Sequence, residues 1–398
     1  MPRRNNSRGG SVTASFLTLY HLEMSEPRNV YHPENDPAFA GLNVNKGIEQ
    51  PDAVNAESVH RFLKKNQGKE LTVAQYCDGI LSGNRTILSR AVTLIESNIP
   101  EHQKTAQEII SHCLPFSGKS VRIGITGVPG AGKSTFIESF GTYLTSTGKK
   151  LAVLAIDPSS ERSRGSILGD KTRMEELASD PNAYIRPSPS SGSLGGVARK
   201  TRETILLCEA AGFDTLLIET VGVGQSETAV HSMVDFFLLL QIAGAGDELQ
   251  GIKRGIMEMA DAIVINKADG DNIHRANSAA TLYRNALHLF PPTLSGWIPQ
   301  VKTCSSIRKT GITEIAQCLE DYFDFVKGNS YFEERRSAQS QFWMHETIEA
   351  QLKSHFYQNK MVKTTLTLLE HEVTNDKLNP FVAANELLEK YFNTIGKH

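Results

Sequence analysis

The feature that most constrains this chain is an eight-residue loop, Gly127-Val128-Pro129-Gly130-Ala131-Gly132-Lys133-Ser134, which matches the pattern G-x-x-x-x-G-K-[ST]. It follows a β-branched apolar run, Val121–Thr126, and precedes a helical pattern that begins near Thr135. Glycines in such a loop let backbone N–H groups point at phosphate oxygens, and the next helix N-terminus adds positive potential. The motif predicts a nucleotide site in which Lys133 reaches the β- and γ-phosphates and Ser134 ligates Mg²⁺.

The region around this loop has the sequence pattern of an α/β fold. Short apolar runs alternate with longer helix-like stretches, which predicts a P-loop NTPase core with a mostly parallel sheet covered on both faces. Ligands of such sheets bind beyond the carboxyl ends of the strands. The expected strands are Val121–Thr126, Leu151–Ile156, Thr215–Glu219, Phe236–Ile242 and Ala262–Asn266, followed by the strand-like run Val301–Cys304.

Helical periodicity flanks the core on both sides. We expect a flexible leader over residues 1–56, an N-terminal helical subdomain over 57–118, the core over 119–327 and a C-terminal helical arm over 328–398. One apolar stripe in the arm joins Met344, Ile348, Leu352 and Phe356, and a second runs from Val362 to Val373. These stripes predict packing on the arm's own domain or a contact between subunits; both alternatives stay open.

Composition sets the class of protein. The 398 residues carry a formal net charge of -2 and are 39% hydrophobic, which indicates neither a nucleic-acid nor a membrane partner. No apolar run approaches the roughly 20 residues that cross a bilayer. Five cysteines without C-x-x-C spacing predict buried, reduced thiols and a cytoplasmic location. The arginines near the N-terminus leave a transit peptide as an alternative to a disordered leader.

A second motif, Asn266-Lys267-Ala268-Asp269, stands at the end of an expected strand and resembles the N-K-x-D motif of GTPases. The Asp269 carboxylate can accept from both guanine N1–H and the exocyclic amine, whereas adenine would leave it unpaired. Ser305-Ser306-Ile307 lies where a last base-contacting loop is expected. The chain is therefore predicted to prefer guanine.

Three carboxylates are candidates for the metal ion. Glu219, Asp157 and Asp170 stand in Glu219–Glu227, Ala155–Pro158 and Gly169–Met174, and the first two end expected strands. Such oxygens hold Mg²⁺ directly or through water. Asp157 or Gln225 could orient the attacking water. Two glycine-dense loops, Gly192–Gly196 and Gly244–Gly251, are typical of switch segments and of long surface turns alike.

From about Leu81 to the C-terminus the chain resembles the MeaB/ArgK family of G-proteins, relatives of the human methylmalonic aciduria type A protein. The strings that carry the resemblance are Ser89–Glu96, the phosphate loop, Ala155–Ser160, Gly165–Met174, Ile185–Pro189, Glu219–Glu227, Gly246–Gly255 and Asn266–Asp269. It implies a homodimeric GTPase chaperone that gates adenosylcobalamin loading into methylmalonyl-CoA mutase and protects that enzyme. The cobalamin-binding string D-x-H-x-x-G is absent, so the cofactor is expected on the partner.

Two other functions compete with this interpretation. A kinase would pass the γ-phosphate to a protein involved in amino-acid transport, but no acceptor domain or H-R-D-like element is visible. An ATPase of the deviant P-loop class would need an early lysine in the loop, where Val128 and Pro129 stand. Hydrolysis of GTP by in-line attack of water, with Lys133 and Mg²⁺ stabilising charge, is the preferred mechanism.

Overall fold

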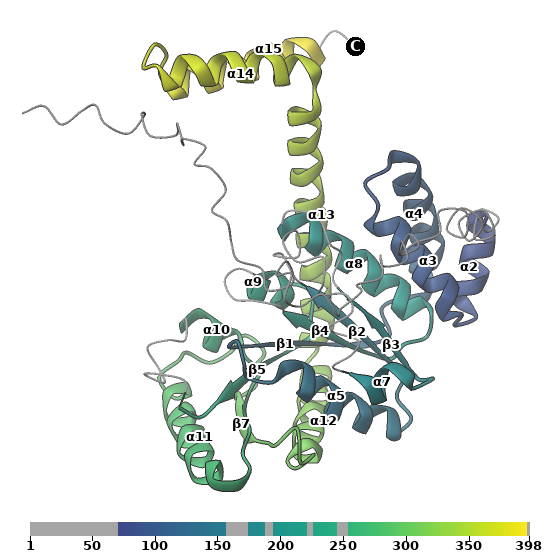
Figure 1. The fold of residues 1–398 in the computed structure, drawn as a ribbon, viewed down its shortest axis with the longest axis vertical. Coiled ribbons are helices and arrows are strands. Elements are labelled where there is room, and N and C mark those ends of the chain that lie inside the picture. Colours follow the sequence, from purple (N-terminus) through teal and green to yellow (C-terminus); the bar gives the residue numbers. More distant parts are fainter. Residues whose placement is uncertain (1–70, 157–173, 188–193, 221–225, 245–253, 396–398) are drawn as a thin grey trace, which may run out of the picture. The chain divides into compact units, whose positions relative to one another are not determined.

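A single parallel sheet organises the protein. The computed structural model describes residues 71–156, 174–187, 194–220, 226–244 and 254–395. Within them seven strands run in the order β3-β2-β4-β1-β5-β6-β7, and every pairing is parallel (Figure 1). The strands are β1 Val121–Gly127, β2 Leu151–Ile156, β3 Ala183–Arg186, β4 Thr215–Thr220, β5 Phe236–Ile242, β6 Ala262–Asn266 and β7 Gln300–Thr303.

All the predicted strands are confirmed to within a residue or two. The strand that the sequence did not reveal is β3, whose four residues are too short to show a period. Central strands are apolar on both faces: the three-residue run Leu216–Ile218 of β4 is fully buried. Because the chain order reverses around β1, the loop after β1 lies at a topological switch point, where ligands of such sheets bind.

Helices cover both faces of the sheet (Figure 1). On one face, α8, α9, α10 and α11 pack on alternate residues such as Phe237 and Leu239, and on the other face α5, α7 and α12 pack on Phe236 and Leu238. The mostly parallel α/β fold is thus confirmed. The bounds are α5 Lys133–Ser146, α7 Glu175–Ser179, α8 Leu194–Ala210, α9 Ser226–His231, α10 Arg254–Met259, α11 Ile273–Leu287 and α12 Ile312–Gly328, with a 3-10 turn η4 at Gly270–Asn272.

In the part of the chain that the structure describes, three helices precede the sheet: α2 Val73–Leu81, α3 Arg85–Glu96 and α4 Pro100–Cys113, followed by η3 Leu114–Phe116. Their starts follow ordinary capping chemistry. The Gln75 N–H donates to the Thr72 hydroxyl at 3.3 Å, and the Thr72 N–H donates to the Gln75 side chain at 2.9 Å. Gly83, two residues after the end of α2, adopts a φ of 76°, as is common for a glycine that ends a helix.

Helices α13 Tyr331–Gln358, α14 Lys360–Thr374 and α15 Pro380–Ile395 follow the sheet. The second predicted stripe is confirmed as part of a small core between α14 and α15, built on Val362, Leu369 and Leu387. The first stripe is different, because Met344, Ile348 and Leu352 on α13 are 53%, 47% and 64% exposed. The domain boundaries at residues 57, 119 and 328 stay predictions.

Other expectations concern the cysteines and the membrane. All five cysteines are buried and free, as predicted. In the described ranges, none of the helices has the length and apolar character needed to span a bilayer. The leader over 1–56, residues 245–251 of the second glycine-dense loop, and Asp157, Asp170 and Gln225 lie outside the described residues. Of the first glycine-dense loop, Gly192 and Ser193 lie outside them, whereas Leu194–Gly196 begin helix α8, so the prediction of a loop is wrong for these three residues.

Candidate functional site

The phosphate-loop motif joins the end of β1 to the start of α5, as predicted. Gly130 and Gly132 have φ values of 80° and 86°, a left-handed conformation that strongly favours glycine. Gly127 is required for a different reason: a Cβ placed there would lie 2.1 Å from the Leu240 carbonyl oxygen of β5. The loop can therefore turn its N–H groups inward only because these positions have no side chain.

Lys133 begins α5 at the centre of this loop. Its ammonium donates to the Gly127 carbonyl at 2.9 Å, so the side chain folds back over the loop. Burial lowers the pKa of Lys133, while the carboxylates of Glu219 and Glu227 raise it. A partly desolvated cation held over glycine N–H groups is suited to the phosphate groups of a nucleotide. Thr135, one residue further into α5 than Ser134, is exposed.

Ser134 and Glu219 bring two oxygen ligands together. The Ser134 hydroxyl lies 3.5 Å from Glu219 Oε1, and Glu219 is 5% exposed near the end of β4. Hard oxygen donors beside a phosphate site fit Mg²⁺, which takes one or two protein ligands together with phosphates and water. The described residues contain no cluster of three or more His, Cys, Asp or Glu side chains that could hold a metal. The other two candidate carboxylates, Asp157 and Asp170, fall outside those residues.

Asn266 connects the phosphate loop to the serine loop. Its Nδ2 donates to the Ala131 carbonyl at 2.8 Å, and its Oδ1 accepts from the Ser306 N–H at 3.1 Å and from the Ser306 hydroxyl at 2.8 Å. The side chain is 2% exposed. Asn266 thus joins two loops that are far apart in sequence and belongs to the frame of the site.

Asp269 and Ser305 form the second pair. The Ser305 hydroxyl donates to Asp269 Oδ2, and Ser305 is fully buried whereas Asp269 is half-buried. A serine that fixes a carboxylate leaves its other lone pairs directed outward, as recognition of a guanine edge requires. Ile307 is 75% exposed and Lys267 is also exposed, with a φ of 59°. Both border the site without being packed into it.

Sequence reasoning did not select three side chains that lie in this region. Thr126 and Thr220 share a buried hydrogen bond of 3.0 Å between the ends of β1 and β4. Glu227, 4% exposed on α9, is close enough to Lys133 to raise its pKa. The threonines gave no signal beyond strand propensity; Glu227 could have been found as the last acid of the Glu219–Glu227 string.

The phosphate loop, the Asn266–Asp269 motif and the serine loop thus meet at one edge of the sheet. A family model described as "Methylmalonyl Co-A mutase-associated GTPase MeaB" matches residues 88–361. The chain belongs to the MeaB family of GTPases. It therefore binds and hydrolyses GTP, and the predicted resemblance and enzymatic activity are confirmed.

Individual relatives agree with the family model. The MeaB-family chain is 45% identical over 320 residues to GTPase ArgK of Escherichia coli, covering 80% of this chain and 97% of that protein. It is 45% identical over 323 residues to the "Methylmalonic aciduria type A homolog, mitochondrial" of Mus musculus, covering 79% and 78%. A crystal structure of a "LAO/AO transport system kinase" superposes with a TM-score of 0.65 at 39% identity, covering 82% of this chain and 99% of that one.

Proposed function

We propose that this MeaB-family GTPase is a chaperone of methylmalonyl-CoA mutase, or of a related cobalamin-dependent acyl-CoA mutase, which gates adenosylcobalamin loading and protects the mutase. The family match over residues 88–361 is the observation that carries the proposal. The family description names a mutase-associated GTPase, and the mouse relative is named for methylmalonic aciduria. Cobalamin is assigned to the partner, because the chain lacks a D-x-H-x-x-G string.

In the proposed mechanism the phosphate loop, Gly127 to Ser134 with Thr135, cradles the phosphates. Lys133 neutralises charge that develops on the γ-phosphate, and Asp269 reads guanine with support from Ser305. Asn266 and Ser306 hold the two loops in register, while Lys267 and Ile307 border the base. Asp157 or Gln225 is proposed to orient the attacking water.

Mg²⁺ is the proposed metal ion. Ser134 and Glu219 would hold it, with Asp157 and Asp170 as further candidates. When bound, the ion would neutralise charge on the phosphate oxygens. The contact between Ser134 and Glu219 supports this choice, since both groups are oxygen donors beside the phosphate loop.

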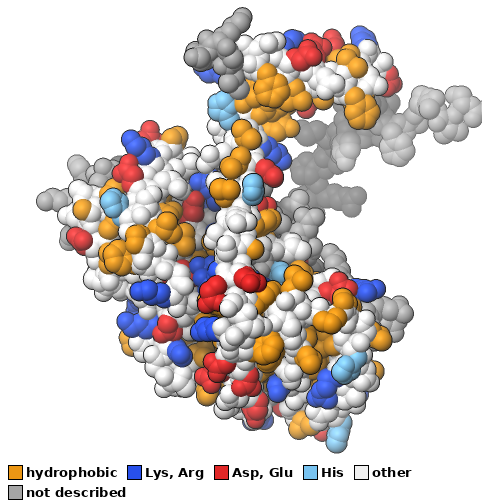
Figure 2. Space-filling view, turned by 180° about the vertical axis from the view of Figure 1, so that it is seen from behind, with side chains coloured by type: hydrophobic (Ala, Val, Ile, Leu, Met, Phe, Trp, Pro, Cys, Tyr) orange, Lys and Arg blue, Asp and Glu red, His pale blue; other side chains and the backbone are white. Residues whose placement is uncertain are grey.

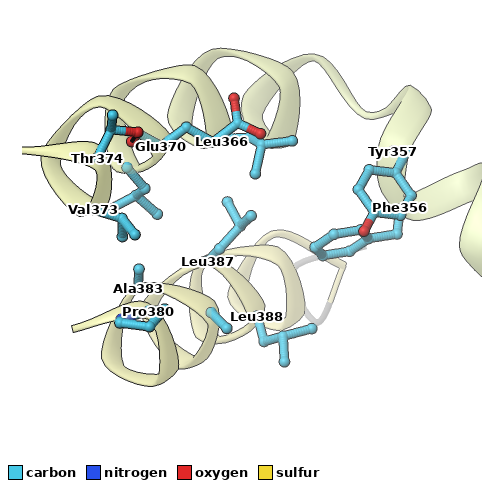
Figure 3. A pocket seen from close by; sticks show the side chains of 12 residues that line it. Phe356, Tyr357, Leu366, Glu370, Val373, Thr374, Pro380, Ala383, Leu387 and Leu388 are labelled. Atoms are coloured by element: carbon cyan, nitrogen blue, oxygen red, sulfur yellow. Dashed lines mark hydrogen bonds between the residues drawn. The ribbon is translucent and has the colours of Figure 1, made fainter. Parts of the chain in front are cut away.

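We further propose that the protein is a cytoplasmic homodimer without nucleic-acid or membrane partners. Two surfaces support the dimer: the exposed stripe of Met344, Ile348 and Leu352, and an apolar pocket of about 410 Å³ between α14 and α15 (Figure 3). Figure 2 shows hydrophobic side chains gathered on these C-terminal helices. A second copy of the same stripe is a self-complementary occupant for such a surface. The pocket is lined by Phe356, Leu366, Leu369, Val373, Ala383 and Leu387.

Phosphate release from GTP and from ATP, with and without a cobalamin-dependent acyl-CoA mutase, tests the function. We expect slow GTP turnover by the free protein and at least fivefold faster turnover when mutase is added, because the partner completes the positioning of the reacting groups. Lys133→Ala should abolish both activities. Loading of adenosylcobalamin into apo-mutase, followed by its absorbance, should then depend on GTP.

Two results would sink this proposal. Turnover that mutase leaves unchanged, together with cofactor loading that is indifferent to GTP, removes the chaperone role. Transfer of labelled γ-phosphate to a protein acceptor supports the alternative, a kinase acting in amino-acid transport. The observation that favours this alternative is the similarity to the protein named as a transport system kinase.

A further inference from the structure

Helix α13 holds the turn between α9 and β5 with consecutive side chains of one helical face. Gln339 Nε2 donates to the Val234 carbonyl at 2.7 Å, and Trp343 Nε1 donates to the Ser232 carbonyl at 3.1 Å. These two donors are four residues apart, so they project from the same side of α13. We call Gln339, Trp343 and their two carbonyl partners the α13 clamp.

Charged side chains of α13 continue the same contact. Arg336 binds both oxygens of Asp235 and also donates to the Ser120 carbonyl at 2.9 Å. One residue before it, Arg335 lies 3.3 Å from His231 Nε2 at the end of α9. The clamp, the ion pair between Arg336 and Asp235 and the contact between Arg335 and His231 together engage every residue from His231 to Asp235 except Met233, which is buried in the core. Such a density of buried polar contacts holds a turn in one position.

Trp343 also contacts the strand that carries the phosphate loop. The Arg122 guanidinium of β1 lies over the Trp343 ring at 5.4 Å, and that of Arg202 lies at 5.7 Å. Arg122 is itself buried, donating from Nε and Nη2 to Glu209 at 2.8 and 3.0 Å. The indole is therefore wedged between β1, α8 and the turn after α9.

The opposite end of α9 begins at Ser226, seven residues after Glu219, whose carboxylate lies 3.5 Å from the Ser134 hydroxyl of the nucleotide site. Glu227, near the start of α9, is buried, and its charge raises the pKa of Lys133. Near the C-terminal end of the helix, Val230 packs so tightly on β1 that a Cβ at Gly124 would lie 2.9 Å from its Cγ1. Because α9 has only six residues and packs closely on β1, we expect a displacement at Glu227 to reach His231.

We propose that Gln339 and Trp343 are positioning residues for the nucleotide site and that α13 responds to nucleotide through them. Phosphate groups that enter beside Lys133 place negative charge next to the Glu227 carboxylate, and like charges repel. The resulting shift of α9 moves the clamped turn, and the turn in turn moves α13. This inference rests on GTP binding by the chain and not on the identity of any partner.

The chain contains two tryptophans, which makes a matched experiment possible. Trp297 also donates its indole N–H to a backbone carbonyl, that of Asp261 at 3.0 Å, but this carbonyl precedes β6 and is not part of the turn after α9. Trp297→Phe leaves Trp343 as the single tryptophan, and Trp343→Phe leaves Trp297. Both full-length proteins are titrated with Mg²⁺ and either GDP or a non-hydrolysable GTP analogue, without mutase.

We expect the emission of Trp343 in the Trp297→Phe protein to differ between GDP and the GTP analogue, and that of Trp297 in the Trp343→Phe protein to stay constant. We also expect release of a fluorescent GDP to accelerate at least fivefold in Trp343→Phe and in Gln339→Met, with no more than a twofold change in Trp297→Phe. Identical Trp343 emission in both nucleotide states would overturn the proposal, as would wild-type release rates in both clamp variants. Because the emission experiment leaves the clamp intact, it decides the question even where a clamp variant does not fold. Failure of the mutase experiment would leave these outcomes untouched.

Discussion

At the scale of single residues, two side chains of the N-K-x-D motif, Asn266 and Asp269, have different partners. Asn266 uses its amide for protein groups, because it bonds Ala131 and Ser306 on either side. Asp269, held by Ser305, is the proposed reader of the nucleotide base. In this proposal the motif combines a structural bracket with a reader of the base.

The contribution of Asn266 to the stability of the protein can be measured. Asn266→Ala leaves the Ala131 carbonyl and the Ser306 donors without their buried partner, which should lower the free energy of unfolding by about 2–4 kcal/mol. Urea denaturation measures the loss. Asn272→Ala is the matched control, since it removes an exposed amide bond to the Lys267 carbonyl and should cost less than about 1 kcal/mol. Equal losses in the two variants would contradict the role of Asn266 as a bracket.

Base recognition by Asp269 can be tested separately from the structural role of Asn266 by comparing nucleotides that carry different bases. Asp269→Asn replaces one acceptor with an amide donor, which faces the guanine amine unfavourably and the O2 carbonyl of xanthine favourably. We expect GTP binding to weaken at least tenfold and XTP binding to strengthen, with the free energy of unfolding within about 1 kcal/mol of wild type. Calorimetric titration with both nucleotides checks this. Retained preference for GTP would place base recognition elsewhere.

At the scale of elements, the buried charges between α9, β6 and α13 respond to pH in opposite directions. Burial and the Arg335 charge lower the pKa of His231 to about 4. Burial raises the pKa of Asp261 to about 6, against the opposing effects of Arg335 at 4.0 Å and the Phe237 N–H. His231 is thus held neutral in the fold, so acid favours the unfolded chain at this position, whereas protonation of Asp261 favours the folded protein.

Comparison with a single variant isolates the contribution of His231 to the pH dependence of stability. Between its ordinary pKa of 6.5 and the folded value of about 4, the unfolded chain binds a proton that the folded protein does not. On going from pH 7.5 to pH 5, wild type should therefore lose about 1–2 kcal/mol of stability relative to His231→Gln. The contribution of Asp261 cancels because both proteins contain it. Parallel stability curves in urea at the two pH values would contradict the buried, neutral state of His231.

At the scale of the whole molecule, the sequence predicted the sheet and the loops at its edge because parallel strands are continuous apolar runs and the loops carry unusual strings. Two features escaped it. Strand β3 is too short to show periodicity. The contact between α13 and the turn after α9 depends on side chains that meet from more than a hundred positions apart, such as Gln339 and Val234, and backbone carbonyls as partners leave no trace in composition. Long-range hydrogen bonds of this kind require coordinates.

The proposed dimer belongs to the same scale. Charge placed on the exposed stripe, as in Ile348→Glu combined with Leu352→Glu, should convert a dimer into a monomer, because desolvating a carboxylate at an apolar contact is costly. The molecular mass measured by light scattering should then fall from twice the chain mass to 43.8 kDa. Lys353→Gln, an exposed change on the same helix, serves as the control and should stay dimeric. An unchanged mass in the double variant would assign subunit contact to another surface.

The order of the strands also determines when the site can exist during synthesis. Strand β1 ends with the phosphate loop at Gly127, yet its two neighbours, β4 and β5, begin only at Thr215 and Phe236, and the bracket Asn266 comes later still. A nascent chain that has emerged only as far as β3 carries the complete loop motif with no strand on either side of it. Such late pairing slows folding and leaves an apolar strand open to aggregation. Ribosomal pausing between residues 127 and 215 would therefore be more harmful to this GTPase than pausing in the C-terminal helices.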